Sequence, residues 1–128
     1  MNFDSLLEKD WKLIEVRQED DNVSLDRSVM EADGLGDVFT LRFDDERISG
    51  KAFSNRYFGS YNRGTGQAIT FGRIAATLIA SFKELDAITE KEYFRYLEEV
   101  QSWNLLQGRL ELYAVTSDNL QVILVFLE

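Results

Sequence analysis

The sequence of 128 residues lacks cysteine, histidine and proline altogether. Without cysteine the chain can form no disulfide, zinc–thiolate site or thiol nucleophile. Without histidine it can form no Ser-His-Asp triad and no His-ligated metal site, and it lacks the usual general base near neutral pH. The absence of proline argues against stiff linkers and proline-rich docking segments. An enzyme would have to use carboxylates, Lys, Tyr or Ser alone, so we expect no enzymatic activity, no catalytic or metal-binding residues and no cofactor.

The sequence is also short of long apolar runs and of positive charge. Its longest apolar stretch, Ile74–Phe82, is much shorter than the roughly 20 residues of a membrane helix. The net charge of −9 disfavours nucleic acid and anionic membranes as partners. The start, MNFDSLLEKDW, lacks the basic residues and apolar segment of a secretory signal. We therefore expect a cytoplasmic protein as the sequence stands, or an envelope or periplasmic one if a signal has been removed.

Acidic residues are missing from one long segment. Residues 51–83 contain five basic side chains and no carboxylate, in a chain with 23 acidic residues. The favoured interpretation is a central sheet whose positions are mostly buried or pressed between layers, because an unpaired buried charge is costly. The alternative is a binding face for an anionic group, built from Arg56, Arg63 and Arg73.

Alternating apolar residues and turn signals near every tenth residue predict a mainly β fold. The length suits one domain, residues 1–128. We expect an α+β antiparallel meander of about eight strands that forms a small, partly open barrel. The expected strands cover residues 11–16, 38–43, 47–53, 56–61, 67–72, 73–82, 103–106, 109–114 and 121–127.

Helical signals are few. Thr89-Glu90-Lys91-Glu92 matches a capping box, and the apolar spacing that follows predicts one amphipathic helix at about 90–101, packed on the barrel. Asp4 can cap a helical turn over 5–9, and 18–37 are expected to form a long connection.

The alternation also predicts which side chains share a face. Val38, Thr40 and Arg42 should face one way, and Phe39, Leu41 and Phe43 the other. Likewise Tyr57, Gly59 and Tyr61 should share a face. Strand 121–127 is apolar at consecutive positions, so it should be covered on both sides.

Several segments together resemble the META domain, or HslJ-like, family. They are Ile48-Ser49-Gly50, Ser54-Asn55-Arg56-Tyr57-Phe58-Gly59-Ser60-Tyr61, Ile74-Ala75-Ala76-Thr77-Leu78-Ile79-Ala80-Ser81, and Leu110-Glu111-Leu112. The resemblance covers about residues 6–127. It implies a bacterial protein related to the heat-shock protein HslJ, associated with stress responses or with the envelope and its lipoproteins. It also implies a non-enzymatic binding or interaction domain of uncharacterised molecular function.

The resemblance also marks a structural motif. Serine stands at Ser54 and Ser81, where many relatives have cysteine, which suggests that these two positions are neighbours in space. The motif residues are Gly50, Ser54, Asn55, Gly59, Thr77 and Ser81. Within it, Asn55 is best explained as a buried amide that ties down the turn backbone, with a ligand contact as the alternative.

Candidate ligand or interaction residues are Asn55, Arg56, Tyr57, Tyr61, Arg63 and Arg73. The aromatic residues Tyr57, Phe58, Tyr61, Phe71 and Trp103 suit an apolar groove, and equally an ordinary core. We expect a monomer whose partner is a protein, a peptide or an apolar small molecule.

A hydrolase that uses only carboxylates, for example Glu84 with Glu111, is the alternative function. Calcium is not expected at Asp20, Asp21 and Asp26, since the calcium-loop pattern with its central glycine and terminal glutamate is missing.

Overall fold

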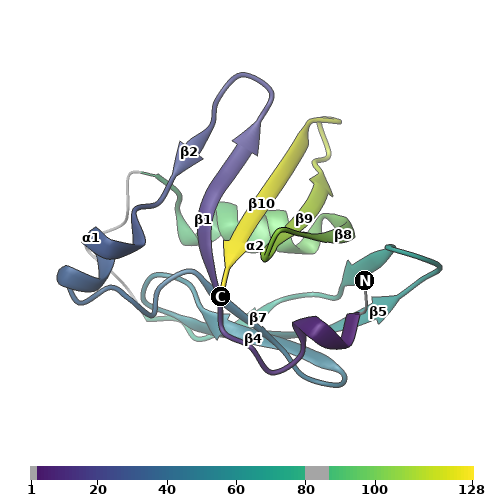
Figure 1. Ribbon diagram of the computed structural model, residues 1–128, viewed down its shortest axis with the longest axis horizontal. Helices are drawn as coiled ribbons and strands as arrows, with labels where there is room; N and C mark the ends of the chain where they lie inside the picture. Colours follow the sequence, from purple (N-terminus) through teal and green to yellow (C-terminus); the bar gives the residue numbers. More distant parts are fainter. Residues whose placement is uncertain (1–2, 80–86) are drawn as a thin grey trace.

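The computed structural model describes residues 3–79 and 87–128, and within them ten strands form one antiparallel sheet (Figure 1). The strand order is β6-β5-β4-β3-β1-β10-β9-β8, with β2 paired to β1 and β7 paired to β5. The strands are β1 (Trp11–Gln18), β2 (Val23–Ser24), β3 (Thr40–Phe43), β4 (Arg47–Lys51), β5 (Arg56–Arg63), β6 (Ile69–Phe71), β7 (Ala75–Ala76), β8 (Val100–Leu106), β9 (Arg109–Val115) and β10 (Gln121–Leu127). The helices of the described part are η1 (Phe3–Leu6, a 3-10 helix), α1 (Arg27–Ala32) and α2 (Glu90–Glu98).

The sheet curls into a barrel that is nearly closed, with one seam between its end strands β6 and β8. An isolated bridge, Ala68 to Ser102, joins the two sides. Next to it the backbone N–H of Trp103 donates to the backbone carbonyl of Gln67 at 3.0 Å. The side-chain amide of Gln67 in turn donates to the backbone carbonyl of Trp103 at 3.1 Å. The mainly β barrel predicted from the alternation is therefore confirmed.

The chain order around the barrel differs from a simple meander. Strand β1 lies between β3 and β10, so the first and last strands are neighbours. The register pairs Lys12 with Leu127 and Gln18 with Val122. Alternation within a strand says nothing about its partner, and this pairing became visible only in the structure.

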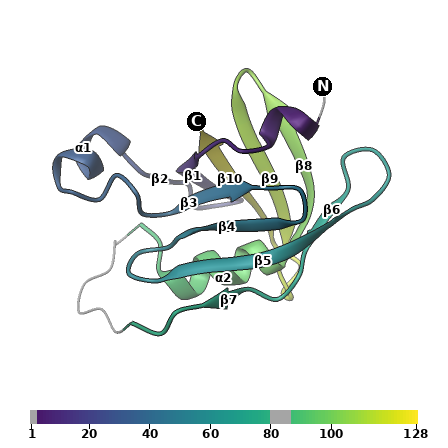
Figure 2. The same cartoon turned by 90° about the horizontal axis from the view of Figure 1, so that it is seen from below.

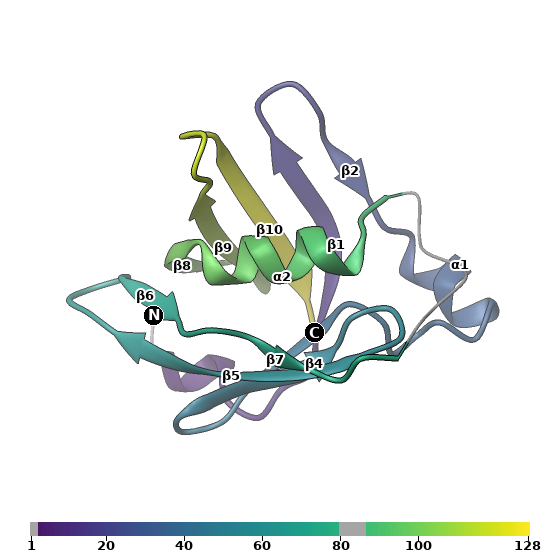
Figure 3. The ribbon, with the colours of Figure 1, turned by 180° about the vertical axis from the view of Figure 1, so that it is seen from behind.

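Helix α2 lies across the barrel, between β1, β10 and β9 on one side and β4, β5 and β7 on the other (Figure 3). The predicted capping box is present: the Thr89 hydroxyl accepts from the Glu92 N–H, and the Glu92 carboxylate accepts from the Thr89 N–H. Tyr93, Tyr96 and Leu97 are buried. The helix ends at Glu98, earlier than predicted, because Val100 already begins strand β8.

The capping box gives a first prediction. Thr89→Ala should lower the free energy of unfolding by about 1 kcal/mol, because the Glu92 N–H loses its acceptor. Thr89→Ser keeps the hydroxyl and should be within about 0.5 kcal/mol of wild type by urea denaturation. Equal stability of the Ala and Ser variants would show that the box contributes nothing.

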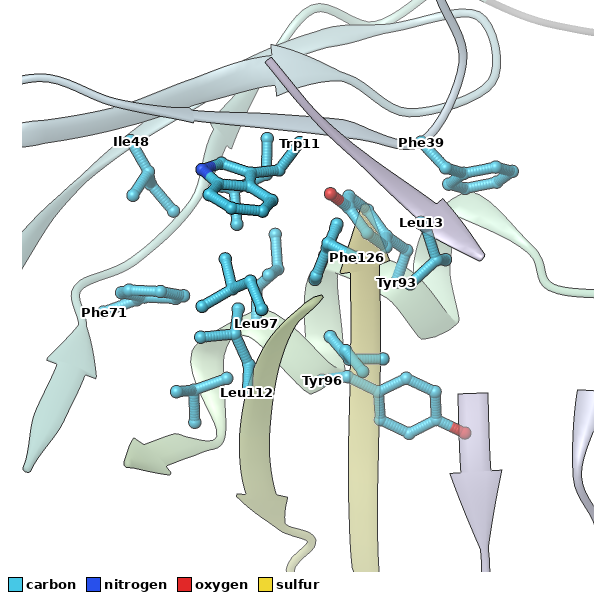
Figure 4. Packing of buried hydrophobic residues seen from close by; sticks show 14 of the residues in the cluster. Trp11, Leu13, Phe39, Ile48, Phe71, Tyr93, Tyr96, Leu97, Leu112 and Phe126 are labelled. Carbon is cyan, nitrogen blue, oxygen red and sulfur yellow. The ribbon is translucent and has the colours of Figure 1, made fainter. Parts of the chain in front are cut away.

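Aromatic side chains fill the barrel (Figure 4). Phe3 of η1 packs edge-on against Phe43 and Trp103, with ring centroids 5.5 and 5.4 Å apart. The Trp11 indole N–H donates to the Leu6 carbonyl at 3.1 Å, which fixes η1 to β1. The predicted helical turn thus occurs slightly earlier in the chain, at 3–6 rather than 5–9.

Strand β10 is covered on its inner face, but the predicted cover on its other face is complete only at Val125, because Ile123 is half-buried and Leu127 is 43% exposed. Val122, Leu124 and Phe126 belong to the core cluster. Val125 is fully buried although it lies outside that cluster. It sits in register between Glu15 and Glu111. Arg17 bridges those two carboxylates and covers Val125 from outside.

The interpretation of residues 18–37 as a plain connection is wrong. This segment contains β2 and α1, and Asp26 caps α1 by accepting from the Ser28 and Val29 N–H groups. Arg27 then donates to three carbonyls, those of Leu13, Gly36 and Val38. Both elements are too short to show a clear periodicity in the sequence. The contacts of Arg27 hold α1, and the pairing with β1 holds β2.

The faces predicted for 38–43 are correct only from Thr40 onward. Val38 and Phe39 are both buried, because Phe39 has φ 52° and this left-handed residue interrupts the alternation. Strand β3 consequently begins at Thr40.

The long strand predicted over 73–82 is wrong in its described part. Only Ala75–Ala76 form a strand. The Ile74 N–H donates to the Glu98 carboxylate and the Ile79 N–H to the Asn55 side chain, so side chains replace a strand ladder there. Residues 80–82 lie outside the described residues.

Candidate functional site

The outer surface of β3, β4 and β5 carries the largest group of basic side chains that the strand register brings together. Leu41, Phe43, Ile48, Tyr57 and Gly59 point inward and are buried. The alternating positions therefore point outward, and Figure 2 is seen from this side. We call this surface the β3–β5 face; its residues are Thr40, Arg42, Arg47, Ser49, Lys51, Arg56, Phe58 and Ser60.

The strand register gives the β3–β5 face a simple layout. One row across the strands runs Arg42, Ser49, Phe58, Ala75. On one side of this row Lys51 is paired with Arg56, and on the other Arg47 is paired with Ser60. Four cations therefore surround Ser49 and Phe58.

Phe58 is 51% exposed and separates two hollows. The larger, about 510 Å³, reaches toward Asp10, Asp37 and Thr40. The smaller, about 230 Å³, lies toward β7 and is lined by Ala75, Ala76 and Thr77. Both are lined by Arg56, Tyr57 and Phe58, so the two hollows adjoin at these residues; we call them together the groove.

The charges of this groove are only partly compensated. Arg42 pairs with Asp10 at 3.0 Å and Lys51 with Asp37 at 3.2 Å. The Arg47 guanidinium lies 5.7 Å from the centroid of the Phe58 ring. Within residues 3–79 and 87–128, neither Arg47 nor Arg56 forms a salt bridge. Lys51 and Arg56 stand directly opposite each other, an arrangement that destabilises a sheet.

The arginines singled out by the sequence do not meet at one place. Arg56 and Arg63 are the first and last residues of β5, so they are about 23 Å apart at 3.3 Å per residue. Arg63 lies over the Phe3 ring, 4.1 Å from its centroid, and Arg73 is exposed in the β6–β7 connection. Arg56 instead joins Arg42, Arg47 and Lys51, which sequence reasoning missed because two of them lie outside the acid-free run.

Burial does not explain the missing carboxylates of residues 51–79, contrary to the favoured interpretation. Most of these positions are exposed or half-buried. The buried ones are Ala52, Asn55, Tyr57, Gly59, Ile69 and Phe71. Since a carboxylate would be tolerated at most of the others, their basic and neutral character is a surface property.

The two candidate tyrosines belong to the core more than to the surface. Tyr57 is buried, and its hydroxyl donates to the Thr40 carbonyl at 2.6 Å and meets the Tyr93 hydroxyl at 2.8 Å. Burial raises the pKa of both Tyr57 and Tyr93 well above the ordinary value of a tyrosine, so both stay protonated. Tyr61 is half-buried against Phe3 and Phe43.

Asn55 is a buried amide that ties the chain together, as its structural interpretation predicted. Its side-chain oxygen accepts from the Thr77 hydroxyl at 2.8 Å and the Ile79 N–H at 2.6 Å. Its side-chain nitrogen donates to the Ile79 carbonyl and to Glu90. No donor or acceptor of the amide is directed at the groove.

Glu90, at the start of α2, completes this network and was not singled out from the sequence. One of its oxygens accepts from the consecutive N–H groups of Phe53, Ser54 and Asn55 at 2.9, 2.7 and 2.8 Å. The other accepts from the Asn55 amide at 2.8 Å. Burial alone would raise the pKa of Glu90, but these hydrogen bonds outweigh it and lower the pKa below its ordinary value.

The other motif residues are structural as well. At Gly50 an added Cβ would lie 2.1 Å from the Thr40 carbonyl oxygen, and at Gly59 it would lie 3.1 Å from Ile74 Cδ1. Ser81 lies outside the described residues, and so does the expected Ser54–Ser81 proximity.

The carboxylates considered for hydrolysis do not form a described pair. Glu111 is buried, accepts from the Tyr113 hydroxyl and forms an ion pair with Arg17 at 3.1 Å; Glu84 lies outside the described residues. Among residues 3–79 and 87–128, no group of three Asp or Glu is arranged to hold a metal ion. Over the same residues, no helix is long and apolar enough to cross a membrane.

Comparisons with known proteins agree with this fold. A solved structure described as "NMR structure of the protein from Burkholderia xenovorans" superimposes with a TM-score of 0.65 and 19% sequence identity, covering 96% of this chain and 84% of that chain. The comparison with curated proteins gave no match. The sequence model of the META domain matches residues 4–125. Because this match spans nearly the whole sequence, the chain belongs to the META domain family.

Proposed function

We propose that this META domain is a non-enzymatic interaction domain and that the β3–β5 face is its binding surface. The observation that carries the proposal is the groove around Phe58, a half-exposed aromatic ring with Arg47, Lys51 and Arg56 at neighbouring register positions and Arg42 one strand further away. Exposed aromatic and arginine side chains are the residues that contribute most to protein interfaces. The two hollows together have the size of an ordinary ligand site.

The absence of cysteine and histidine favours binding over catalysis, because few groups remain that could act as nucleophile or base. The buried tyrosines beneath the groove are held protonated, and Glu111 is engaged with Arg17 and Tyr113. The resemblance to the family supports a further proposal on the biological process and the location of the domain. The domain acts in a bacterial stress response or heat-shock response, in the cytoplasm or, behind a removed signal or lipoprotein anchor, in the envelope.

A displayed library of random ten-residue peptides tests the binding surface. Peptides selected on the wild-type protein should bind the double variant Arg56→Gln/Phe58→Ala at least tenfold more weakly, because the variant removes the ring and one free cation from the groove.

The matched control is Leu106→Ala/Arg109→Gln. These two residues form a similarly exposed apolar–basic pair in the β8–β9 hairpin, and the selected peptides should bind this control within twofold of wild type. A selection without binders, or binders that do not distinguish the two variants, would contradict the proposed surface.

A further inference from the structure

We propose that the β3–β5 face binds an acidic peptide segment of a partner protein, with carboxylates on Arg56 and Arg47 and an apolar side chain against Phe58. This inference rests on the proposed function and names the class of partner that it requires. It differs from the anionic site that the sequence offered as an alternative, since Arg63 and Arg73 take no part.

The positive charge at the centre of the face is not fully balanced by described carboxylates. Arg47 and Arg56 flank Phe58 and form no salt bridge within the described residues, although the protein has 23 acidic residues. Lys51 and Arg56 repel each other across β4 and β5. A carboxylate placed between them would relieve this repulsion and could accept both N–H groups of the arginine fork.

The carboxylates that now pair with the cations of the face can be exchanged for those of a ligand. Asp10 and Asp37 hold Arg42 and Lys51, but their side chains are 71% and 60% exposed. Exposed ion pairs of this kind contribute little to stability. The carboxylates of a ligand can therefore replace them without unfolding any part of the sheet.

The face also suits an apolar part of the partner. Phe58 lines both hollows, and Ala75, which is paired with it, continues the apolar surface on the β7 side. An aromatic or aliphatic side chain of a peptide can cover this ring while neighbouring residues reach the cations. Burying the exposed part of Phe58 would add binding free energy that a simple anion does not obtain.

The margins of the face favour a short acidic peptide over a nucleic acid or an anionic membrane. Asp10 and Asp37 line one margin, and the exposed Asp44, Asp45 and Glu46 lie at the β3–β4 turn. A nucleic acid carries a phosphate at every residue and would pass over these acidic margins, as would a flat anionic membrane. A peptide can confine two or three carboxylates to the basic centre.

Fluorescence anisotropy with two labelled peptides tests the inference on the full chain. The acidic probe is Gly-Glu-Asp-Phe-Glu-Asp-Gly, and the neutral probe replaces each acid by its amide. We expect the acidic probe to bind at least tenfold more tightly. Arg56→Glu should weaken the binding of the acidic probe at least tenfold, and Phe58→Ala should weaken it about fivefold. Arg109→Glu, which changes the net charge equally at an exposed site on β9, should change it less than twofold.

The other outcomes separate the inference from the proposed function. Equal or tighter binding of the neutral probe, still lost in Phe58→Ala, would overturn the acidic partner and leave the binding surface standing. Binding of an oligothymidine strand or of anionic phosphatidylserine vesicles that is tighter than that of the acidic probe, and sensitive to Arg56→Glu, would assign the face to nucleic acid or membrane instead. Self-association in sedimentation that is abolished by Arg56→Glu would make a second copy of the chain the occupant. No Arg56-dependent binding of the acidic probe would overturn the inference outright.

Discussion

Gly50→Ala should lower the free energy of unfolding by about 3–5 kcal/mol, among the larger effects of a single substitution. Gly50 points into the barrel from β4, and the added Cβ would lie 2.1 Å from the Thr40 carbonyl oxygen and 2.9 Å from the Tyr57 hydroxyl. Neither atom can withdraw easily. The Thr40 oxygen is bound to Tyr57 and Tyr93, at 2.6 and 3.2 Å, and both rings are buried.

The control for this prediction is Gly34→Ala, measured by the same urea denaturation. Gly34 has φ 78° and nothing within 4 Å of an added Cβ, so only the left-handed backbone opposes alanine there, at about 1–2 kcal/mol. A Gly50→Ala variant that is no less stable than Gly34→Ala would mean that the backbone at Thr40 yields readily. The close approach of β3 and β4 would then not require glycine.

Glu90→Gln should cost about 2–3 kcal/mol at neutral pH, because hydrogen bonds to a charged acceptor are the strong ones. The carboxylate accepts from three consecutive N–H groups and from the Asn55 amide. Glutamine keeps one acceptor oxygen. Its NH₂ group replaces the other oxygen and would face an N–H donor that then has no acceptor. The loss should appear as a lower urea midpoint with an unchanged m-value. The matched control is Glu98→Gln at the other end of α2. Among the described residues, its carboxylate accepts from the Ile74 N–H alone, so the cost should be about 1 kcal/mol or less.

The same carboxylate predicts a pH dependence. The pKa of Glu90 is lowered in the folded protein relative to its ordinary value of 4.5. Ionised Glu90 therefore stabilises the fold above pH 4.5, and this contribution is lost as the pH falls through the lowered pKa. The difference in unfolding free energy between wild type and Glu90→Gln should thus be constant near neutrality and shrink in acid. A difference that stays constant or grows in acid would contradict the role of the charged form.

The parts of the fold that the sequence predicted well are those with strong local signals. The strand 121–127 has its predicted bounds, and the capping box at Thr89 starts α2 where expected. Alternation placed Tyr57, Gly59 and Tyr61 on one face of β5, and this is the face that the structure turns inward. In each case the signal depends on residues within one element, whose geometry alone fixes the side-chain directions.

The parts that it predicted badly depend on side chains from distant elements. Residues 73–79 look like a strand, yet Glu98 and Asn55 bind their backbone groups. The short helix α1 is held by Arg27, whose partners lie on three other segments of the chain. The candidate site follows the same rule, because the cations around Phe58 come from β3, β4 and β5 and share a face only through strand register.

The sequence by itself determined that this protein is a β-rich META domain without histidine or thiol chemistry. Composition and local periodicity do not depend on how the chain closes. Tertiary structure alone decided that β1 joins β10, that Glu90 binds the turn before β5, and that Arg42, Arg47, Lys51 and Arg56 lie on one face with Phe58. The physical reason is that hydrogen-bonded register and charge repulsion act between residues that are near in space, whatever their separation along the chain.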